Sequence, residues 1–255
     1  MLIIVPPSES KRPAPESGPA LDLAGLSFPE LTSTRALLIE ALVTTSARPD
    51  AFRRLGLRPS HAPEIARNTW LTELPTIPVL DLYTGPLHAG LDAARLSLPA
   101  KARLRDGLVV SSALWGLLRP SDHVPPYRLH VNARPIGIDR IDATWRAVLP
   151  DVLAAVAGDR LVVDLRSIYY QAMGLPKGLE DRTVALKIDQ GPNHQVGDVI
   201  AKRVRGEAAH HLLESAVEPE DPEALADALA DRWPVRLEEP ERRGRPWTMT
   251  LTVDA

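Results

Sequence analysis

The 255-residue sequence contains no cysteine. This absence excludes disulfides, thiolate metal sites and a cysteine nucleophile. No apolar run approaches the roughly 20 residues that a membrane-spanning helix needs. The N-terminal stretch MLIIVPPSESKRP lacks the basic region and the long apolar run of a secretion signal. The sequence therefore predicts a cytoplasmic protein that does not contact a membrane.

The sequence also lacks the short motifs that mark several common nucleotide, hydrolase and metal sites. It contains no GxxxxGKS or GxxxxGKT phosphate loop, no GxGxxG fingerprint, no GxSxG nucleophile turn and no HExxH motif. His210 and His211 are adjacent on a predicted helix and point about 100° apart, so they cannot bind one metal ion as a pair. We therefore expect no metal site and no cofactor.

Basic residues do not outnumber acidic ones: 30 Lys and Arg stand against 33 Asp and Glu, for a formal net charge of −3. Proteins that bind nucleic acid without sequence specificity usually carry a net basic surface. An acidic protein can still carry a basic cleft, because the distribution of charge matters more than its sum. The composition therefore permits a local anion site and disfavours a uniformly basic surface.

Apolar runs and helical periodicity are interspersed along the chain without a clean β-α-β alternation. The pattern predicts a single mixed α+β domain spanning residues 1–255. Strands are predicted at 1–5, 76–83, 107–113, 160–165, 183–188, 233–238 and 247–253. Helices are predicted at 29–48, 49–57, 61–71, 87–95, 99–106, 141–156 (interrupted by Pro150), 198–214 and 222–233, with a short turn or helix at 114–118.

Polar groups follow two of the predicted strands directly. The stretch PPSESKRP brings Ser8 and Lys11 after the first strand, and DLYTG brings Tyr83 and Thr84 after the second. Polar groups at strand ends often bind ligands in α/β proteins. A solvated turn, or a tyrosine that anchors a turn closed by glycine, would give the same pattern. Spacing alone does not separate these interpretations.

A carboxylate stands inside the most apolar strand, in VVDLRSIYY. A buried carboxylate requires a partner, and Arg166, Arg128 and Lys202 are the candidates for Asp164. The same pattern is typical of a purely structural ion pair. If the chain stays extended after this strand, one of Tyr169 and Tyr170 must face inward.

Two further stretches add cations. In VSSALWGLLRPSDHVPPYRL, an apolar run is followed by Arg119, Tyr127 and Arg128. In AKRVRG, Lys202 and Arg205 lie at i and i+3 on one face of a helix, where they can hold a phosphate or form an ordinary solvated face. Because four polar clusters each adjoin a strand-like run, we expect them to converge on one cleft.

The order of these motifs resembles the YaaA family of bacterial peroxide-stress proteins. The resemblance runs through YTG, SALWGLLRP, PYRL, DLRSIYY and AKRVRG, and PPSESKRP and LSFPELT resemble the actinobacterial branch. It implies a central β-barrel-like sheet surrounded by helices, and DNA binding through a positive cleft with a helix-hairpin-helix element. After PYRL the family commonly continues with Met-Gly, whereas this chain has His130, Val131 and Asn132. This divergence favours a member specialised for a smaller ligand.

Three interpretations follow. In the first, the cleft binds phosphate-bearing nucleic acid or a small nucleotide. In the second, the protein is an enzyme that acts on a nucleotide or nucleoside, for example by cleaving an N-glycosidic bond, with Asp164 or His130 as the acid or base. In the third, the charged residues form a structural ion-pair network without a ligand. The candidate catalytic residues are Asp164, His130, Tyr127 and Lys202, and the candidate ligand-binding residues are Ser8, Lys11, Tyr83, Thr84, Arg119, Arg128, Arg166, Tyr169 and Arg205.

Overall fold

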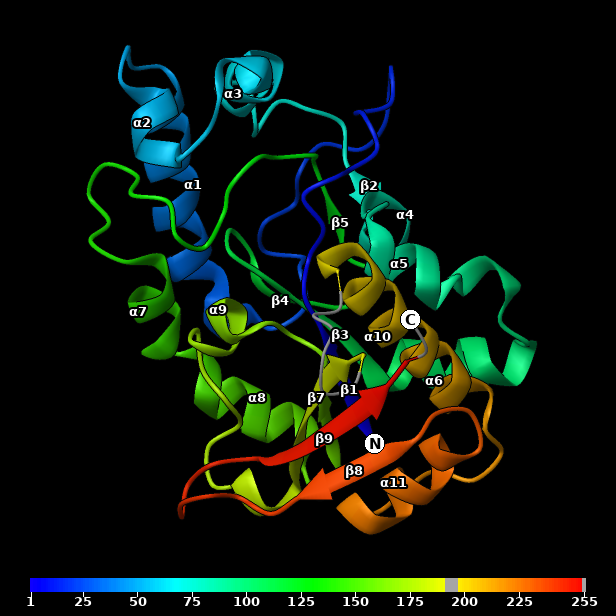
Figure 1. Cartoon of the computed structure of the whole chain (residues 1–255). Helices are drawn as coiled ribbons and strands as arrows, with labels where there is room; N and C mark the ends of the chain where they lie inside the picture. The colour runs from blue at the N-terminus through cyan, green and yellow to red at the C-terminus, as the bar shows by residue number, and fades with distance from the viewer. Residues whose placement is uncertain (191–196, 254–255) are drawn as a thin grey trace.

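A mostly parallel seven-stranded sheet forms the centre of the computed structural model, which describes residues 1–190 and 197–253 (Figure 1). Its strand order is β4-β3-β1-β6-β7-β9-β8. A separate pair, β2 with β5, is antiparallel. The strands are β1 (Leu2–Val5), β2 (Ile77–Pro78), β3 (Leu108–Ser112), β4 (Gly116–Leu118), β5 (His123–Val124), β6 (Val162–Asp164), β7 (Thr183–Asp189), β8 (Val235–Glu238) and β9 (Trp247–Thr252).

The sheet corrects two of our predictions about the fold. β3, β1, β6, β7 and β9 run parallel, and only the edge strands β4 and β8 pair in the antiparallel sense, so the fold is α/β rather than α+β. The expected barrel is not shown either, because β4 and β8 stand at opposite edges of an open sheet. The connection from Val5 of β1 to Leu108 of β3 is long and contains many short helices, so the β-α-β pattern is not apparent in the sequence.

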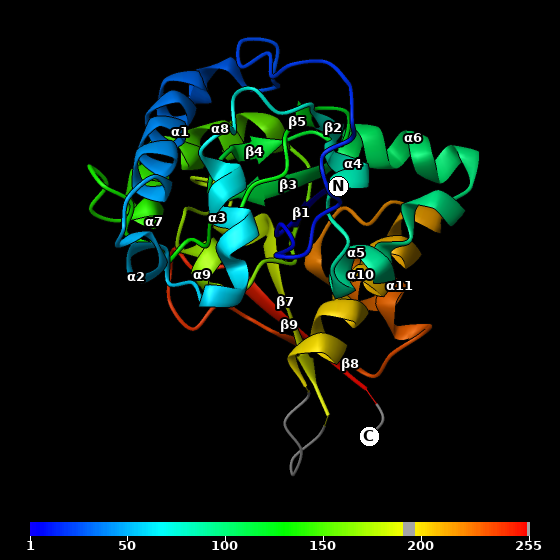
Figure 2. The same ribbon diagram turned by 90° about the horizontal axis from the view of Figure 1, so that it is seen from above.

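Helices cover both sides of the sheet. Figures 1 and 2 show α5, α6, α10 and α11 on one side and α1, α7 and α8 on the other. None of the helices in the described part of the chain is long and apolar enough to cross a membrane. The α-helices are α1 (Thr32–Ser46), α2 (Ala51–Leu55), α3 (Ala62–Asn68), α4 (Val79–Leu82), α5 (Pro86–Leu91), α6 (Leu98–Gly107), α7 (Ile141–Arg146), α8 (Leu149–Ala157), α9 (Ile168–Gln171), α10 (Asp198–Glu214) and α11 (Pro222–Ala230).

One local prediction is wrong, and a second is correct only in part. The run 76–83 contains only the two-residue β2 and then helix α4, because Val79 and Leu82 are buried at helical spacing, which a short apolar run does not distinguish from a strand. For 114–118 we predicted a short turn or helix; residues 113–115 form a turn, and strand β4 follows it at 116–118. Gly116, at φ +72°, begins β4 beneath the ring of Trp145, where a β-carbon would meet ring atoms 2.5 Å away.

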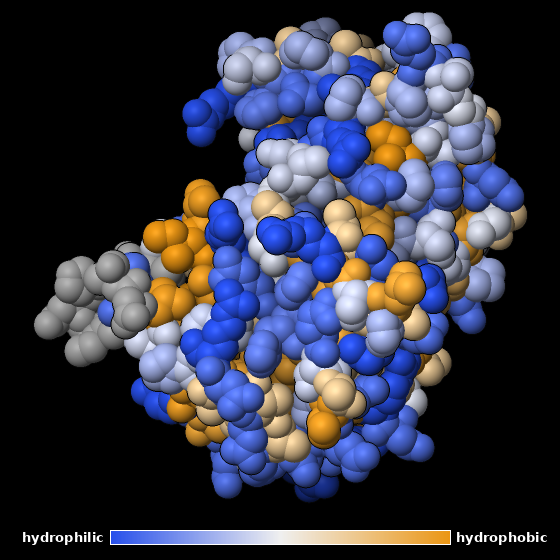
Figure 3. All heavy atoms as spheres, turned by 90° about the vertical axis from the view of Figure 1, so that its right-hand side faces the viewer, coloured by the Kyte–Doolittle hydropathy of each residue, from blue (hydrophilic) through white to orange (hydrophobic). Residues whose placement is uncertain are grey.

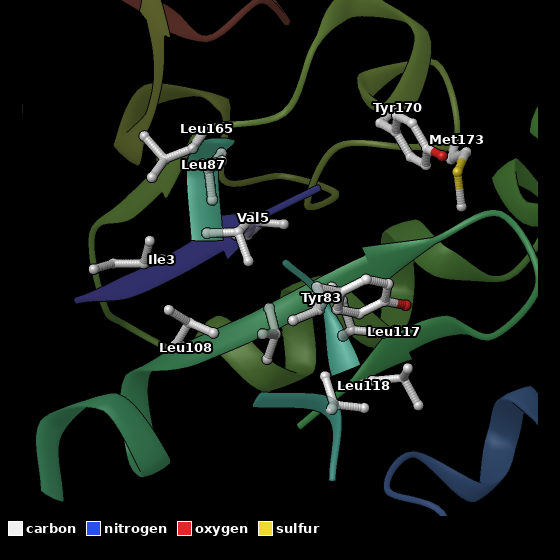
Figure 4. Close-up of a cluster of buried hydrophobic side chains, with 14 of the residues drawn as sticks. Ile3, Val5, Tyr83, Leu87, Leu108, Leu117, Leu118, Leu165, Tyr170 and Met173 are labelled. Atoms are coloured by element: carbon white, nitrogen blue, oxygen red, sulfur yellow. The ribbon is translucent and has the colours of Figure 1, made fainter. Parts of the chain in front are cut away.

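The other predicted elements form close to their expected bounds. The interruption at Pro150 separates α7 from α8, and the proline occupies the first turn of α8, where its missing N–H costs no hydrogen bond. The core is a single hydrophobic cluster that includes all four residues of β1. Figure 4 shows part of this cluster, with Ile3 and Val5 of β1, Leu87 of α5 and Leu165.

Helices α5 and α10 touch backbone to backbone through two glycines. A β-carbon on Gly206 of α10 would overlap the carbonyl oxygen of Leu87, and one on Gly90 of α5 would overlap the carbonyl oxygen of Arg203. Because backbone atoms cannot move aside as a flexible side chain can, glycine is required at both positions. This contact fixes where α10 stands relative to the loop before α5.

The substitution Gly206→Ala tests this contact. We expect it to lower the free energy of unfolding by about 1–3 kcal/mol through overpacking, despite the higher helix propensity of alanine. Chemical denaturation measures the loss. The matched control is Gly197→Ala, where the added methyl group meets no atom of the described residues within 4 Å. Equal losses in the two variants would show that the α5–α10 contact does not require glycine.

Candidate functional site

A pocket of about 420 Å³ opens where the parallel strands β1 and β6 end. Its wall comes from the loop after β1, the loop after β6, the residues that follow β5, the start of α5 and the first turns of α10. Figure 3 views the molecule from the side on which α10 lies and shows a hollow in this surface. The lining residues with polar or ionisable side chains are Ser8, Glu9, Ser10, Lys11, His88, Arg128, His130, Ser167, Tyr169, Tyr170, Asp198, Lys202 and Arg205.

The topology explains the position of this pocket. The chain passes from β1 to β3 on one side of β1 and later to β6 on its other side. Loops that leave neighbouring parallel strands in opposite directions separate at their carboxyl ends, where α/β proteins bind ligands. Of the residues predicted to converge, Ser8, Lys11, Arg128, His130, Tyr169, Lys202 and Arg205 line the pocket.

Lys11 is held in place by its own backbone. It forms an isolated antiparallel bridge with Tyr83, flanked by hydrogen bonds from Arg12 N–H to the Leu82 oxygen and from Thr84 N–H to the Ser10 oxygen. Its Nζ donates to the Ser8 carbonyl oxygen at 2.7 Å. Burial, followed by the nearby charge of Arg128, lowers the pKa of Lys11 to about 7. Thr84 contributes its backbone, and its exposed side chain does not line the pocket.

Beneath Lys11 lies a chain of three hydroxyl groups. Ser112 Oγ accepts from the N–H groups of Leu114 and Trp115, so its two lone pairs are used and its proton goes to Tyr127 Oη at 2.6 Å. The hydroxyl groups of Tyr127 and Tyr83 share a hydrogen bond of 3.0 Å, in which either can be the donor. Burial raises the pKa of Tyr127 to about 12 and that of Tyr83 well above 10. Both tyrosines are therefore protonated donors near neutral pH.

The tyrosine rings also contact the amine. Lys11 Nζ lies 4.3 Å from the ring centroid of Tyr127 and 5.4 Å from that of Tyr83. Neither tyrosine lines the pocket. The structure thus places these two predicted site residues behind Lys11 as its supporting surface, which the order of residues in the sequence does not reveal.

The segment after β5 supplies Arg128 and His130. Asn68 of α3 holds this segment by accepting from Arg128 N–H and donating to the Arg128 oxygen, both at 2.9 Å. The guanidinium of Arg128 pairs with Glu9 at 2.8 Å. His130 Nδ1 accepts from Asn132 N–H at 3.1 Å, so in its neutral form the ring proton lies on Nε2. Burial is the largest cause that lowers the pKa of His130.

Helix α10 brings two cations to the pocket, as its sequence predicts. Lys202 pairs with Asp198 of the preceding turn at 2.5 Å, and both side chains are largely exposed. Arg205 donates through Nε to the Leu186 oxygen at 3.3 Å, and among the described residues no carboxylate lies within 4.0 Å of it. Burial lowers the pKa of Arg205. Arg205 is therefore a partly buried cation that no carboxylate of the described residues contacts, although the charges of Asp198 and Asp164 partly offset the effect of burial on its pKa.

Asp164 is placed behind the pocket rather than on its wall. Both oxygens accept from the guanidinium of Arg166, at 2.9 and 2.8 Å, and both side chains have no exposed surface. The Arg166 guanidinium also donates to the carbonyl oxygens of Tyr170 and Gly174. The pair therefore fixes the turn after β6, which directs Tyr170 inward and leaves Tyr169 54% exposed at the pocket.

Arg119 does not reach the pocket, contrary to our expectation. β4 runs antiparallel to β3, so the chain that follows β4 returns to the opposite end of the sheet. There Arg119 donates to the Asp106 oxygen, just before β3 begins, and stacks on Phe28. Asp122 holds the turn through the N–H groups of Ser27 and Arg119.

His88 is a pocket residue that sequence reasoning missed. It lies in α5 with its ring 5.1 Å from that of Tyr83, and Nε2 donates to the Pro6 oxygen at 3.1 Å. Burial lowers its pKa to about 4, so it is neutral near pH 7. Its place three residues after YTG was the only signal available.

A second hollow, of about 590 Å³, is shallower than this pocket and is lined by fewer polar side chains. It is lined by Arg48, Arg54 and Arg134 together with residues 135–139. Arg48 and Arg54 both pair with Asp50, which neutralises part of its positive charge. The residues the structure describes contain no cluster of three or more side chains suited to a metal ion, in either hollow or elsewhere.

A family model described as "Peroxide stress protein YaaA" matches residues 1–238. The chain belongs to the YaaA family. A UPF0246 protein of Streptomyces coelicolor is 37% identical over 99% of this chain and 98% of its own length. A UPF0246 protein of Corynebacterium efficiens is 36% identical over 99% of this chain and 100% of its own. The family predicted from the motif order is confirmed.

The buried ion pair between Asp164 and Arg166 leads to a prediction about the stability of this YaaA-family protein. Asp164→Asn leaves the Arg166 guanidinium buried without a compensating charge, so we expect a loss of about 3–5 kcal/mol in the free energy of unfolding. The control is Asp151→Asn, which breaks the exposed pair with Lys177 and should change little. Urea denaturation of both variants measures the difference. Similar small effects would contradict a structural role for Asp164.

A second prediction concerns pH. The unfolded chain binds the Lys11 proton up to about pH 10.5 and the folded chain only up to about pH 7, so the free energy of unfolding rises with pH between these values. Lys11→Met removes this titration. The stability difference, wild type minus variant, should grow from pH 7 to 10.5 and be constant below pH 7. Urea titrations at several pH values measure it, and a flat difference would mean that Lys11 titrates normally.

Proposed function

We propose that the pocket binds a phosphate-bearing ligand of mononucleotide size, either free or as the end of a nucleic acid. The observation that carries this proposal is the convergence of Lys11, Arg128, Lys202 and Arg205 on one pocket from three separate segments of the chain. Two carboxylates, Glu9 and Asp198, also line the pocket, and each already pairs with one of these cations. Guanidinium groups suit phosphate because their planar donors match its oxygens.

The dimensions favour a small ligand over a duplex. A volume of about 420 Å³ falls in the range of roughly 300–1,000 Å³ typical of small-molecule pockets. Exposed apolar side chains surround the polar wall: Ile168 and Tyr169 follow β6, and Val199 begins α10. Hydrophobic side chains also gather on the surface in Figure 3. Tyr169 offers a face on which a base can stack.

An enzyme that acts on a nucleotide or nucleoside is the second candidate. Asp164 is fully engaged by Arg166 and does not line the pocket, so His130 is the residue to which we assign acid–base chemistry. The observation that favours this candidate is the pair His130 and Lys11, two pocket groups whose pKa values are both lowered toward or below neutrality.

A binding experiment tests the first proposal. We expect AMP or GMP to bind more tightly than adenosine or guanosine, because only the monophosphates engage the cations. Arg205→Gln should weaken monophosphate binding about tenfold or more, since a hydrogen bond to a charged group contributes about 1.5–3 kcal/mol. Isothermal titration calorimetry measures both affinities, with inorganic phosphate as a competitor.

The matched control is Arg119→Gln, an arginine from the same predicted cleft that the fold places at the opposite end of the sheet. Its binding constant should equal that of the wild type. Single-stranded and duplex DNA tested across a salt series separate a nucleotide site from a DNA surface. Tight, salt-sensitive duplex binding that Arg205→Gln leaves unchanged would overturn the proposal.

A further inference from the structure

Lys11 differs from its neighbours in what surrounds its charge. Arg128 pairs with Glu9, whereas in the described part of the chain no carboxylate lies within 4.0 Å of Lys11 Nζ. Its hydrogen bond goes to the Ser8 carbonyl oxygen, and the ring of Tyr127 lies 4.3 Å away. An ammonium ion in this position is poorly solvated and faces another cation. The uncharged amine is therefore stabilised relative to the ammonium ion.

We propose that Lys11 is a nucleophilic amine that forms an imine with an aldehyde or ketone group of the phosphate-bearing ligand, such as an open-chain sugar phosphate. This inference rests on the proposed function, because Arg128, Lys202 and Arg205 hold the phosphate. A lysine that is desolvated and next to another cation is activated in this way in enzymes that use imines. Lys11 also lines the pocket and is partly exposed to it, so a ligand can reach it.

The reaction balances without an oxidant, a reductant or a metal ion. The Nζ lone pair attacks the carbonyl carbon, the C=O π electrons move to oxygen, and a proton passes from nitrogen to that oxygen to give a carbinolamine. The C–O bond then breaks, the oxygen takes a second proton and leaves as water, and nitrogen forms the C=N bond. The remaining N–H proton returns to solvent or a base. The second proton comes from solvent or from the imidazolium form of His130 in the same pocket, because the Nε2–H of a neutral imidazole is too weak an acid to deliver it.

The groups around the amine define its pH dependence. Burial lowers its pKa most, Arg128 and Arg67 lower it further, and Glu9 and Glu64 raise it, to a net value of about 7. Tyr83, Tyr127 and His88 also contact or face Lys11, and all three are neutral near pH 7. Imine formation at Lys11 should therefore increase with a midpoint near pH 7, while an ordinary surface lysine reacts efficiently only at much higher pH.

The test is reductive trapping. The full chain is incubated with ribose 5-phosphate and sodium cyanoborohydride, and the covalent adduct is detected by intact mass and located by peptide mapping. We expect modification at Lys11 in preference to the other lysines, and much less with ribose, which lacks the phosphate. The remaining lysines are Lys101, Lys177, Lys187 and Lys202.

Lys11→Arg keeps a cation but cannot form an imine, and should lose about tenfold or more of the trapped product. Lys177→Met removes an exposed lysine outside the pocket and should leave trapping at Lys11 unchanged. Peptide mapping of the wild type decides the question even if the Lys11 variant folds poorly. Modification spread evenly over the lysines, or equal trapping with ribose, would overturn the inference.

AMP binding, measured alongside, separates this inference from the proposed function. If AMP binds and ribose 5-phosphate is not trapped, Lys11 is a phosphate-binding cation and only the imine inference fails. If AMP does not bind and no adduct forms, both proposals fail. If AMP binds and Lys11 alone is modified with a midpoint near pH 7, both are supported.

Discussion

The contact between the backbones of α5 and α10 is the constraint on which the rest of the pocket depends. Gly90 and Gly206 allow the helices to approach so closely that backbone meets backbone. Gly206 stands one residue after Arg205, so the contact sets the depth at which this guanidinium enters the pocket. Just before α5, Gly85 packs against the side chain of Ser8, which connects the start of this helix to the loop that carries Lys11.

The molecule buries several cations and treats them differently. The guanidinium of Arg166 is neutralised by Asp164, and that of Arg35 donates to the carbonyl oxygens of Ser27, Trp115 and Leu117. Arg35 Nη1 is nevertheless buried without a hydrogen-bond partner among the described residues, so incomplete hydrogen bonding alone does not mark a functional site. Lys11 has no carboxylate within 4.0 Å in the described part of the chain and donates to one carbonyl oxygen, that of Ser8. It differs from Arg35 and Arg166 because it also lines the pocket, where an incompletely compensated charge is a candidate for chemistry.

The sequence predicted which strand ends converge more accurately than which side chains line the pocket. We expected convergence because polar clusters adjoin strand-like runs such as the one ending at Val5, whereas the parallel sheet that brings the carboxyl ends of β1 and β6 together was not predicted. The position of Arg119 was predicted wrongly because β4 runs antiparallel to β3, and a short sequence pattern does not reveal the direction of a strand in the sheet. The sequence also could not show whether Asp164 lines the pocket, because a carboxylate at a strand end gives the same pattern whether it faces a ligand or an arginine two residues away.

Strand β1 ends in Pro6 and Pro7, which have no amide hydrogen to continue the pairing with β3 and β6. The pairing of β1 with its neighbours therefore stops after Val5, because the proline residues that follow have no N–H group to donate. Each wall of the resulting opening comes from a different loop, anchored to its own strand or helix. Residues of these loops, such as those at 130–132, can therefore be substituted without removing a hydrogen bond between strands of the sheet. The two prolines separate the loop that lines the pocket from the hydrogen bonds that hold the sheet together.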